Sequence, residues 1–311
     1  MKLPQLSFAP ARIFRSDFVP EWLGIVLMFA IAGVWMAGID FDVHIAWHDF
    51  ALPLAAVIGI VGAHSMKGRA PGLIAEYFAL TVFATVAFGF LSYLSMTTGR
   101  PFVDRDLLAA DRALGFDWLA MFHWFAAHPW IKKAFEIVYG TLVYQGLYFG
   151  VLFGLMDRKQ DLREMFWLVF VAGIFTCLGA ALFPALGTFK VFGFNALGTF
   201  IPDMEKLHSG KHLSFVLTKM TGVVSFPSFH TTMALAYIYG FSRAGAIGWV
   251  IAVLNIVMFV SIPIFGGHYL VDMLAGAVVM AGSLGIVKAW PSLLVTRGAE
   301  PVPVAKDAFA N

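Results

Sequence analysis

The sequence contains a single cysteine, Cys177, among 311 residues. One thiol cannot close an intramolecular disulfide, and it cannot supply a cysteine-based metal site. Cys177 lies inside a long apolar run, where a free cysteine usually behaves as a small buried residue. Disulfide-stapled folds and cysteine-based zinc folds are therefore excluded.

Charged residues are also scarce. Lys, Arg, Asp and Glu make up 13% of the chain, whereas apolar residues make up 60%. An ordinary soluble domain carries about twice that share of charge. The net charge of +2 gives no electrostatic reason to expect a nucleic-acid partner. Long uncharged runs instead predict an all-α polytopic membrane protein.

Nucleotide and metal motifs are missing as well. The glycine-rich stretch 187–198 lacks the Gly-Lys-Ser/Thr motif of a phosphate-binding loop. His44 and His48 have the spacing of a ligand pair on a helix, but two histidines do not complete a metal site. We expect no cofactor and no bound metal.

Apolar runs of spanning length recur along the chain and predict about eight transmembrane helices. No signal peptide is evident, because the first run is long enough to serve as an anchor. The expected spans are 22–39, 50–66, 77–98, 135–156, 165–186, 228–243, 244–265 and 268–288.

Two segments between the spans are long. Residues 100–133 alternate charged and apolar residues and then become aromatic, which predicts amphipathic helices lying in the membrane interface. The aromatic residues Trp118, Phe122, Trp124 and Trp130 are typical of an interfacial belt, and the same residues would also suit the floor of a lipid entrance. Residues 187–227 are expected to form a long loop, and the polar end of the chain is expected to be disordered.

The distribution of basic residues predicts the orientation. Eight spans place both termini on one side, and that side collects the Lys and Arg residues of the short loops. The short loops 40–49 and 265–267 on the other side contain none. The positive-inside rule therefore places the termini in the cytoplasm and the two long segments outside the cytoplasmic membrane.

Two short motifs carry the chemistry. In the first, Ser228 precedes His230 after a proline and stands where a helix N-cap would stand. In the second, His268 follows two glycines and Asp272 comes four residues later. Residues four apart share a helix face, so Asp272 can hold one ring nitrogen of His268 and leave the other free. This pairing makes an imidazole a nucleophile or a base, and a helix start suits a phosphate oxyanion.

These motifs resemble those of the type 2 phosphatidic acid phosphatase superfamily. Two segments are similar to the inositolphosphotransferase-like branch of this superfamily, 225–230 and 266–272, and the first has phenylalanine at 229 where glycine is usual. The segment 111–118 is also similar to that branch. The resemblance covers roughly residues 70–290. It implies a six-helix core preceded by two extra helices: 1–70 for the lead-in and extra helices, 71–290 for the catalytic domain, and 291–311 for a cytoplasmic tail.

The resemblance also implies a two-step mechanism. His268 attacks phosphorus while Asp272 stabilises the imidazolium, and His230 protonates the leaving oxygen. Ser228 and the N–H of Phe229 would hold the non-bridging oxygens, and Gly267 would allow a close approach of the ligand.

Two cations of the superfamily pattern are absent. Tyr93 stands at the lysine position of the first motif, and Ile262 stands at the usual arginine position of the third. Arg100 is the first candidate to replace them at the phosphate, and the lysines of 187–227 are weaker candidates.

The expected function is that of a membrane phosphatase or phosphotransferase acting on a lipid-linked phosphate at the outer face. The sequence does not separate water from a lipid alcohol as the acceptor, so transfer of a phospho-headgroup, as in inositol phosphorylceramide synthase, stays open. A transporter or scaffold that retains the fold without the activity is the alternative of another class.

Overall fold

The computed structural model describes residues 16–64, 66, 69–211 and 213–290. The expected tail at 291–311 and most of the expected lead-in lie outside these residues. The described chain is predominantly helical, as the all-α prediction requires, with one pair of three-residue strands.

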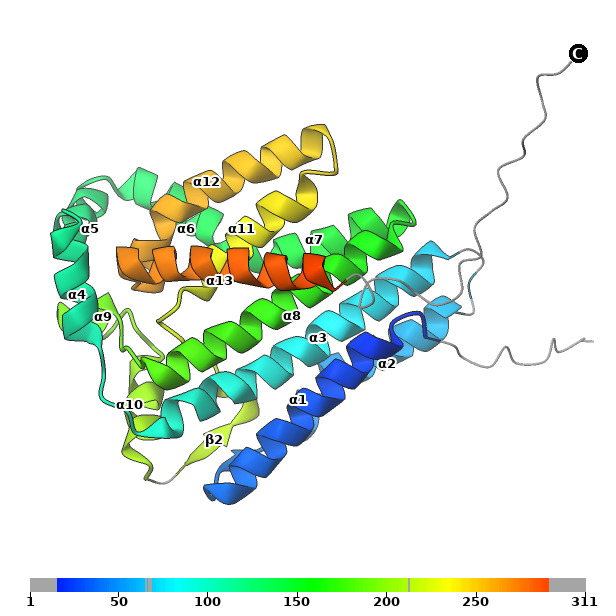
Figure 1. The fold of residues 1–311 in the computed structure, drawn as a ribbon, viewed down its shortest axis with the longest axis horizontal. Helices are drawn as coiled ribbons and strands as arrows, with labels where there is room; N and C mark the ends of the chain where they lie inside the picture. The colour runs from blue at the N-terminus through cyan, green and yellow to red at the C-terminus, as the bar shows by residue number, and fades with distance from the viewer. Residues whose placement is uncertain (1–15, 65, 67–68, 212, 291–311) are drawn as a thin grey trace, which may run out of the picture.

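Long apolar helices lie side by side and form the body of the molecule (Figure 1). Helix α3 packs against α1, α2 and α8, whereas α11 packs against α12 and α13. Helix α8 contacts both groups, so it connects them. These helices are α1 (Val19–Gly38), α2 (Ala51–His64), α3 (Ala70–Ser95), α6 (Pro129–Gly140), α7 (Leu142–Leu155), α8 (Lys159–Leu182), α11 (Phe229–Phe241), α12 (Ala246–Gly266) and α13 (Leu270–Ala289).

Five of the described helices are long and apolar enough to cross a membrane: α1, α3, α8, α12 and α13. A sixth span results if α6 and α7, which are bent by 44° relative to each other, are counted as one. The expected count of eight is not confirmed. Helices α2 and α11 have 14 and 13 residues and are shorter than the roughly 17–25 residues of an ordinary span.

The bent pair also corrects an expected boundary. Helix α6 begins at Pro129, well before the predicted start at 135, so the end of the segment expected in the interface belongs to it. Proline suits the first turn of a helix, because no intrahelical partner exists there for an N–H. The break falls between Gly140 and Leu142.

Short helices cover one end of the bundle (Figure 1). They are α4 (Asp104–Ala113), α5 (Trp118–Ala127), α9 (Thr188–Val191) and α10 (Ile201–Ser209). Helices α4 and α5 confirm the prediction of helices in 100–133. The segment 187–227 is more ordered than the predicted loop, because it contains α9, α10, β2 (Ser214–Val216) and a 3₁₀ turn, η3 (Leu217–Lys219).

The strands show that His44 and His48 do not form a pair on a helix, although their spacing would fit one. Strand β1 (Asp42–His44) runs parallel to β2, with Asp42 opposite Ser214. His44 therefore lies on a strand, with its Nε2 2.9 Å from the Ser214 hydroxyl oxygen. His48 lies in a 3₁₀ turn, η1 (Trp47–Phe50). The two side chains do not share a helix face.

The other end of the bundle collects ion pairs. A buried pair between Arg163 and Glu21, at 2.7 Å, ties α8 to α1. Three more basic residues come together here from different turns through Asp161 and Glu164: Arg158, Arg243 and Lys288. The loops predicted to share the cytoplasmic face therefore meet at one end of the molecule.

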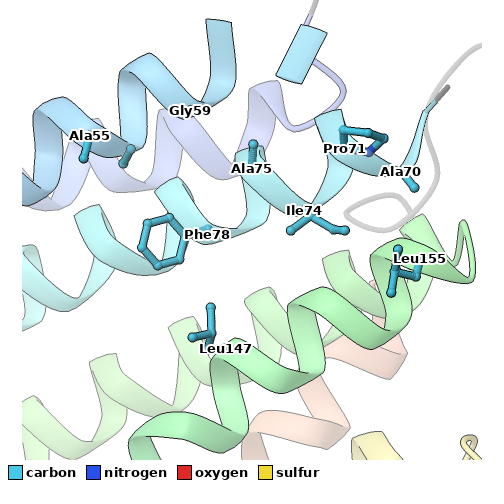
Figure 2. Close-up of a pocket in the computed structure, with 10 residues that line it drawn as sticks. Ala55, Gly59, Ala70, Pro71, Ile74, Ala75, Phe78, Leu147 and Leu155 are labelled. Atoms are coloured by element: carbon cyan, nitrogen blue, oxygen red, sulfur yellow. The ribbon is translucent and has the colours of Figure 1, made fainter. Parts of the chain in front are cut away.

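An apolar groove with a volume of about 480 Å³ lies between α2, the start of α3, and α7 (Figure 2). Its walls include Ala55, Ile74, Phe78 and Leu147, and no charged residue lines it among those that the structure describes. Helix α3 begins at the end of the bundle away from α4 and α5, so the groove is separate from the histidine motifs (Figure 1).

Candidate active site

The two predicted histidines come from the starts of neighbouring helices. His230 is the second residue of α11, and His268 lies in the turn between α12 and α13. Their ring centroids are 5.7 Å apart. The Ser228 N–H donates to the Asp272 carbonyl at 3.0 Å, which fixes the start of α11 to that of α13. Both motifs therefore meet at the end of the bundle that the short helices cover.

His268 and Asp272 are buried together. Asp272 Oδ2 lies 3.4 Å from His268 Nδ1, and the two side chains are 3% and 0% exposed. Oδ2 also accepts the Tyr269 N–H at 2.9 Å. Among the described residues, Asp272 Oδ1 has no hydrogen-bond partner. The carboxylate faces Nδ1, so Nε2 is the nitrogen that could attack an electrophile.

The two glycines before His268 allow this turn to be tight. Gly267 has a φ of +65°, and a Cβ there would come within 2.7 Å of the Phe189 ring. A Cβ on Gly266 would come within 2.6 Å of His268 Cδ2. The Gly267 carbonyl accepts the Thr188 N–H at 2.8 Å. A larger residue at either position would displace the imidazole or the neighbouring chain.

Tyr139 contacts His230 and was not predicted from the sequence. Its hydroxyl oxygen lies 2.8 Å from His230 Nε2. The two rings stack with centroids 4.8 Å apart and an interplanar angle of 18°. Tyr139 lies near the end of α6, next to the break before α7. A tyrosine within an apolar run carries no specific signal, and the break was the one local feature that could have drawn attention to it.

Two carboxylates of α4 hold the chain on either side of His268. Asp111 accepts the N–H groups of Leu270 and Val271, each at 2.9 Å, and so caps α13 from a distant helix. Asp104 accepts the Gly187 N–H at 2.8 Å and the Tyr269 hydroxyl at 3.0 Å. Burial raises the pKa of Asp111, and the two N–H groups oppose that effect. The predicted segment 111–118 therefore contacts the site through its first residue.

The predicted phosphate ligands differ in their surroundings. Ser228 is the N-cap of α11, as predicted, and its hydroxyl accepts the Thr231 N–H at 3.3 Å. The N–H of Phe229 is the first of the helix and has no intrahelical acceptor. Arg100 is exposed and forms no hydrogen bond or ion pair with any described residue.

The two positions that lack the usual cations are buried. Ile262 packs in an apolar cluster. The Tyr93 hydroxyl donates to Asp203 at 2.6 Å and accepts the Thr221 N–H, so it anchors α10. Within the described chain, no lysine or arginine forms a hydrogen bond or ion pair with His230, His268 or Asp272.

The loop lysines that the structure describes do not fill this role in the free protein. Lys190 pairs with Glu205 at 2.6 Å. Lys206 donates to the Ser214 carbonyl. Lys211 and Lys219 are exposed.

Aromatic residues pack against the site at its covered end. The Trp118 indole N–H donates to the Pro263 carbonyl at 2.8 Å, and its ring stacks on Phe192. Trp118 is 2% exposed, so it is not the interfacial belt residue that was predicted. Trp124 and Trp130 are exposed, as belt residues are. Burial of His268 beneath this cluster lowers its pKa to about 4, against the opposing effect of a backbone hydrogen bond with Ser225.

A bundle of membrane-spanning helices that brings two histidines together, one of them buried and backed by an aspartate, defines a membrane protein with an imidazole-based site. The chain belongs to the PAP2 superfamily, whose model matches residues 105–286, more than half of the sequence. The match runs from α4 into α13 and includes both histidine motifs. Membership indicates phosphatase-type or phosphotransferase-type chemistry. No curated protein and no solved structure matches the chain.

Proposed function

We propose that the protein is an integral-membrane lipid phosphatase or phosphotransferase that works through a phosphohistidine on His268. The observation that carries the proposal is the pair of histidine rings 5.7 Å apart, with Asp272 behind only one of them. One imidazole backed by a carboxylate serves as nucleophile, and a second without one serves as acid and then base.

The first step forms a bond between His268 Nε2 and phosphorus and breaks the bond to the leaving oxygen. Asp272 stabilises the positive charge that develops on the imidazole. His230 provides the proton for the leaving oxygen. In the second step an acceptor hydroxyl attacks phosphorus, the P–N bond breaks, and His230 recovers the proton.

Phosphate oxygens would be held by the start of α11, where the Phe229 N–H is free of intrahelical bonds and the helix dipole favours negative charge. Gly267 has no side chain, so the ligand could approach the backbone of the turn closely. Ser228 would stabilise the start of α11 as its N-cap. Arg100 would close on the phosphate from the end of α3 when substrate binds.

A lipid substrate suits a site in this position. His268 is 2% exposed, and α5 and α9 contribute the aromatic cover at the end of the bundle. An amphiphilic substrate would enter sideways between helices, with its phosphate at the histidines and its chains in the membrane. The distribution of basic residues supports the proposal that this end lies at the outer face of the cytoplasmic membrane.

The test uses the full-length protein in detergent with dioleoylphosphatidic acid, and it measures the release of inorganic phosphate. We expect turnover by the wild type and none by His268→Ala. Asp272→Asn should lose activity on the order of 10⁴-fold, by analogy with removal of the carboxylate from a catalytic triad. Near-normal turnover by His268→Ala would refute the phosphohistidine.

Transfer of a phospho-headgroup to a lipid alcohol is the second candidate, and it is favoured because no lysine or arginine in the described part of the chain contacts the histidines. A phosphate monoester carries a charge of about −1.5 to −2 near neutral pH, whereas a diester carries a single charge. A buried charge without a partner is costly, so the site as described suits the diester better.

A parallel assay separates the two candidates. The same preparation is given a headgroup-labelled phospholipid together with ceramide or diacylglycerol. Label that moves to the lipid alcohol, with no release of inorganic phosphate from phosphatidic acid, identifies a transferase. Absence of turnover in both assays would favour a non-catalytic scaffold or transporter.

A further inference from the structure

The Tyr139 hydroxyl is hydrogen-bonded to Nε2 of His230, the nitrogen through which His230 would transfer a proton. The oxygen lies 2.8 Å from His230 Nε2, within hydrogen-bond distance. The rings are stacked, so the imidazole cannot rotate away without losing that contact. A leaving oxygen and the tyrosine hydroxyl therefore compete for the same nitrogen.

The hydroxyl also lies on the side of His268. The position of a Cβ on Gly266 would be 3.0 Å from the Tyr139 oxygen and 3.2 Å from His268 Nε2. The hydroxyl and the nucleophilic nitrogen thus flank the same glycine. The Tyr139 oxygen therefore contacts His230 Nε2 and also lies near the side of Gly266 on which His268 Nε2 is found.

We propose that Tyr139 is a catalytic residue that relays the proton between His230 and the oxygen that leaves or attacks phosphorus. The relay rests on the proposed function. A phenol can accept one hydrogen bond while it donates another, so it can pass a proton on without ionising. It needs no change of position, because it already contacts His230.

The relay balances in both steps. As the bond from phosphorus to the leaving oxygen breaks, that oxygen takes the Tyr139 proton, and the Tyr139 oxygen takes the Nε2 proton of the His230 imidazolium. His230 ends neutral, and Tyr139 is unchanged. In the second step the acceptor hydroxyl gives its proton to the Tyr139 oxygen, whose own proton returns to His230 Nε2 as the P–N bond breaks.

The experiment compares two leaving groups in the same detergent-purified variants. The alkyl substrate is dioleoylphosphatidic acid, whose leaving oxygen must be protonated. The aryl substrate is 4-nitrophenyl phosphate, whose phenolate leaves without a proton. The variant Tyr139→Phe keeps the ring stacked on His230 and removes only the hydroxyl. Its matched control is Tyr144→Phe, because Tyr144 lies in α7 and is 69% exposed.

For Tyr139→Phe we expect kcat on the alkyl substrate to fall by about 10²–10⁴-fold, the usual contribution of acid–base catalysis, and release of 4-nitrophenol in the first step to change little. His230→Ala should show the same pattern. Tyr144→Phe should keep both activities, and His268→Ala should lose both.

An equal loss of kcat on the alkyl substrate and of first-step 4-nitrophenol release would show that Tyr139 is only structural, and no change in either rate would show that it is dispensable. Either result overturns the relay and leaves the proposed function intact. A wild type inactive on both substrates would overturn the proposed function itself. If Tyr139→Phe does not elute as a single folded species, 3,5-difluorotyrosine at position 139 provides a phenol of nearly equal size and greater acidity. If Tyr139 is the relay, kcat of the difluorotyrosine variant on the alkyl substrate must change, while its first-step release of 4-nitrophenol must not.

Discussion

At the scale of single residues, the site combines a buried carboxylate with two imidazoles and draws on no cation among the described residues. Asp272 has an oxygen without a partner, and His268 is almost fully buried. Burial favours the neutral imidazole, which is the form that can attack phosphorus. Binding of an anionic substrate therefore requires charge compensation that the described residues do not supply at the histidines.

The pKa of His268 gives a prediction for the pH dependence. Burial lowers this pKa from the usual 6.5 to about 4. Because the nucleophile must be unprotonated, protonation of His268 removes activity only as the pH falls toward this lowered pKa. We expect kcat/KM, which reports the free enzyme, to keep its value below the ordinary histidine pKa and to fall near pH 4. An acid limb centred near 6.5, reversible on return to neutral pH, would contradict this assignment.

Arg100 has a prediction of its own. If it closes on the phosphate, Arg100→Ala should cost about 2–5 kcal/mol of transition-state binding, the scale for removing one partner of a desolvated charge pair. Arg100→Lys should recover little, because a point charge does not reproduce a two-pronged contact. The measurement is kcat/KM, with Lys190→Ala as control, since Lys190 pairs with Glu205. Wild-type kcat/KM in Arg100→Ala would leave Arg100 as a plain interfacial residue.

At the scale of elements, α4 is the support for the turn that carries His268. One face of this helix presents Asp104 and Asp111, which together accept the backbone N–H groups of 186–187 and 270–271 and the Tyr269 hydroxyl. A carboxylate at the start of α13 also complements the helix dipole. The segment that a membrane topology would assign to the surface thus determines the geometry of the site.

Replacing Asp111 tests this support. In Asp111→Asn only the amide oxygen can accept, so one of the two N–H groups at Leu270 and Val271 loses a good acceptor. We expect kcat to fall about tenfold, the equivalent of one typical hydrogen bond or dipole contact of about 1.4 kcal/mol, with KM nearly unchanged. The matched control is Asp106→Asn, on the exposed face of the same helix. Equal activities in the two variants would show that α4 does not support the geometry of the site.

At the scale of the whole molecule, the two ends of the bundle differ in character. The end with the histidines is covered by aromatic residues and short helices, and the other end gathers Arg158, Arg243 and Lys288 in ion pairs. The orientation with the basic end in the cytoplasm stays a prediction, and it rests on these same basic residues.

Cysteine labelling tests the orientation. In a background with Cys177→Ala, a cysteine at Ser209 should react with an impermeant thiol reagent in intact cells. One at Gln160 should react only after permeabilisation. Both positions are exposed, whereas the neighbouring Lys159 is buried in an ion pair with Asp17. The opposite pattern would place the site on the cytoplasmic face.

Local features were predictable from the sequence because their physics acts over a few residues. Apolar runs predicted a helical membrane protein, and Ser228 was recognised as a helix cap. The spacing of His268 and Asp272 predicted their contact, although His268 lies just before α13 and not on a face of that helix. Where local rules conflict with distant contacts, prediction failed. His44 pairs with a strand more than a hundred residues away, so its spacing to His48 did not produce a helix face.

Only the tertiary structure decided which other groups meet at the histidines. Tyr139 reaches His230 across 91 positions of sequence, and Asp111 reaches the start of α13 across 159. Trp118 points inward because its indole N–H donates to the Pro263 carbonyl, although the aromatic segment around it is typical of a surface belt. Neither periodicity nor spacing records such contacts. Helix packing creates them, when it brings side chains from separate helices to one buried point and each polar group there must find a partner.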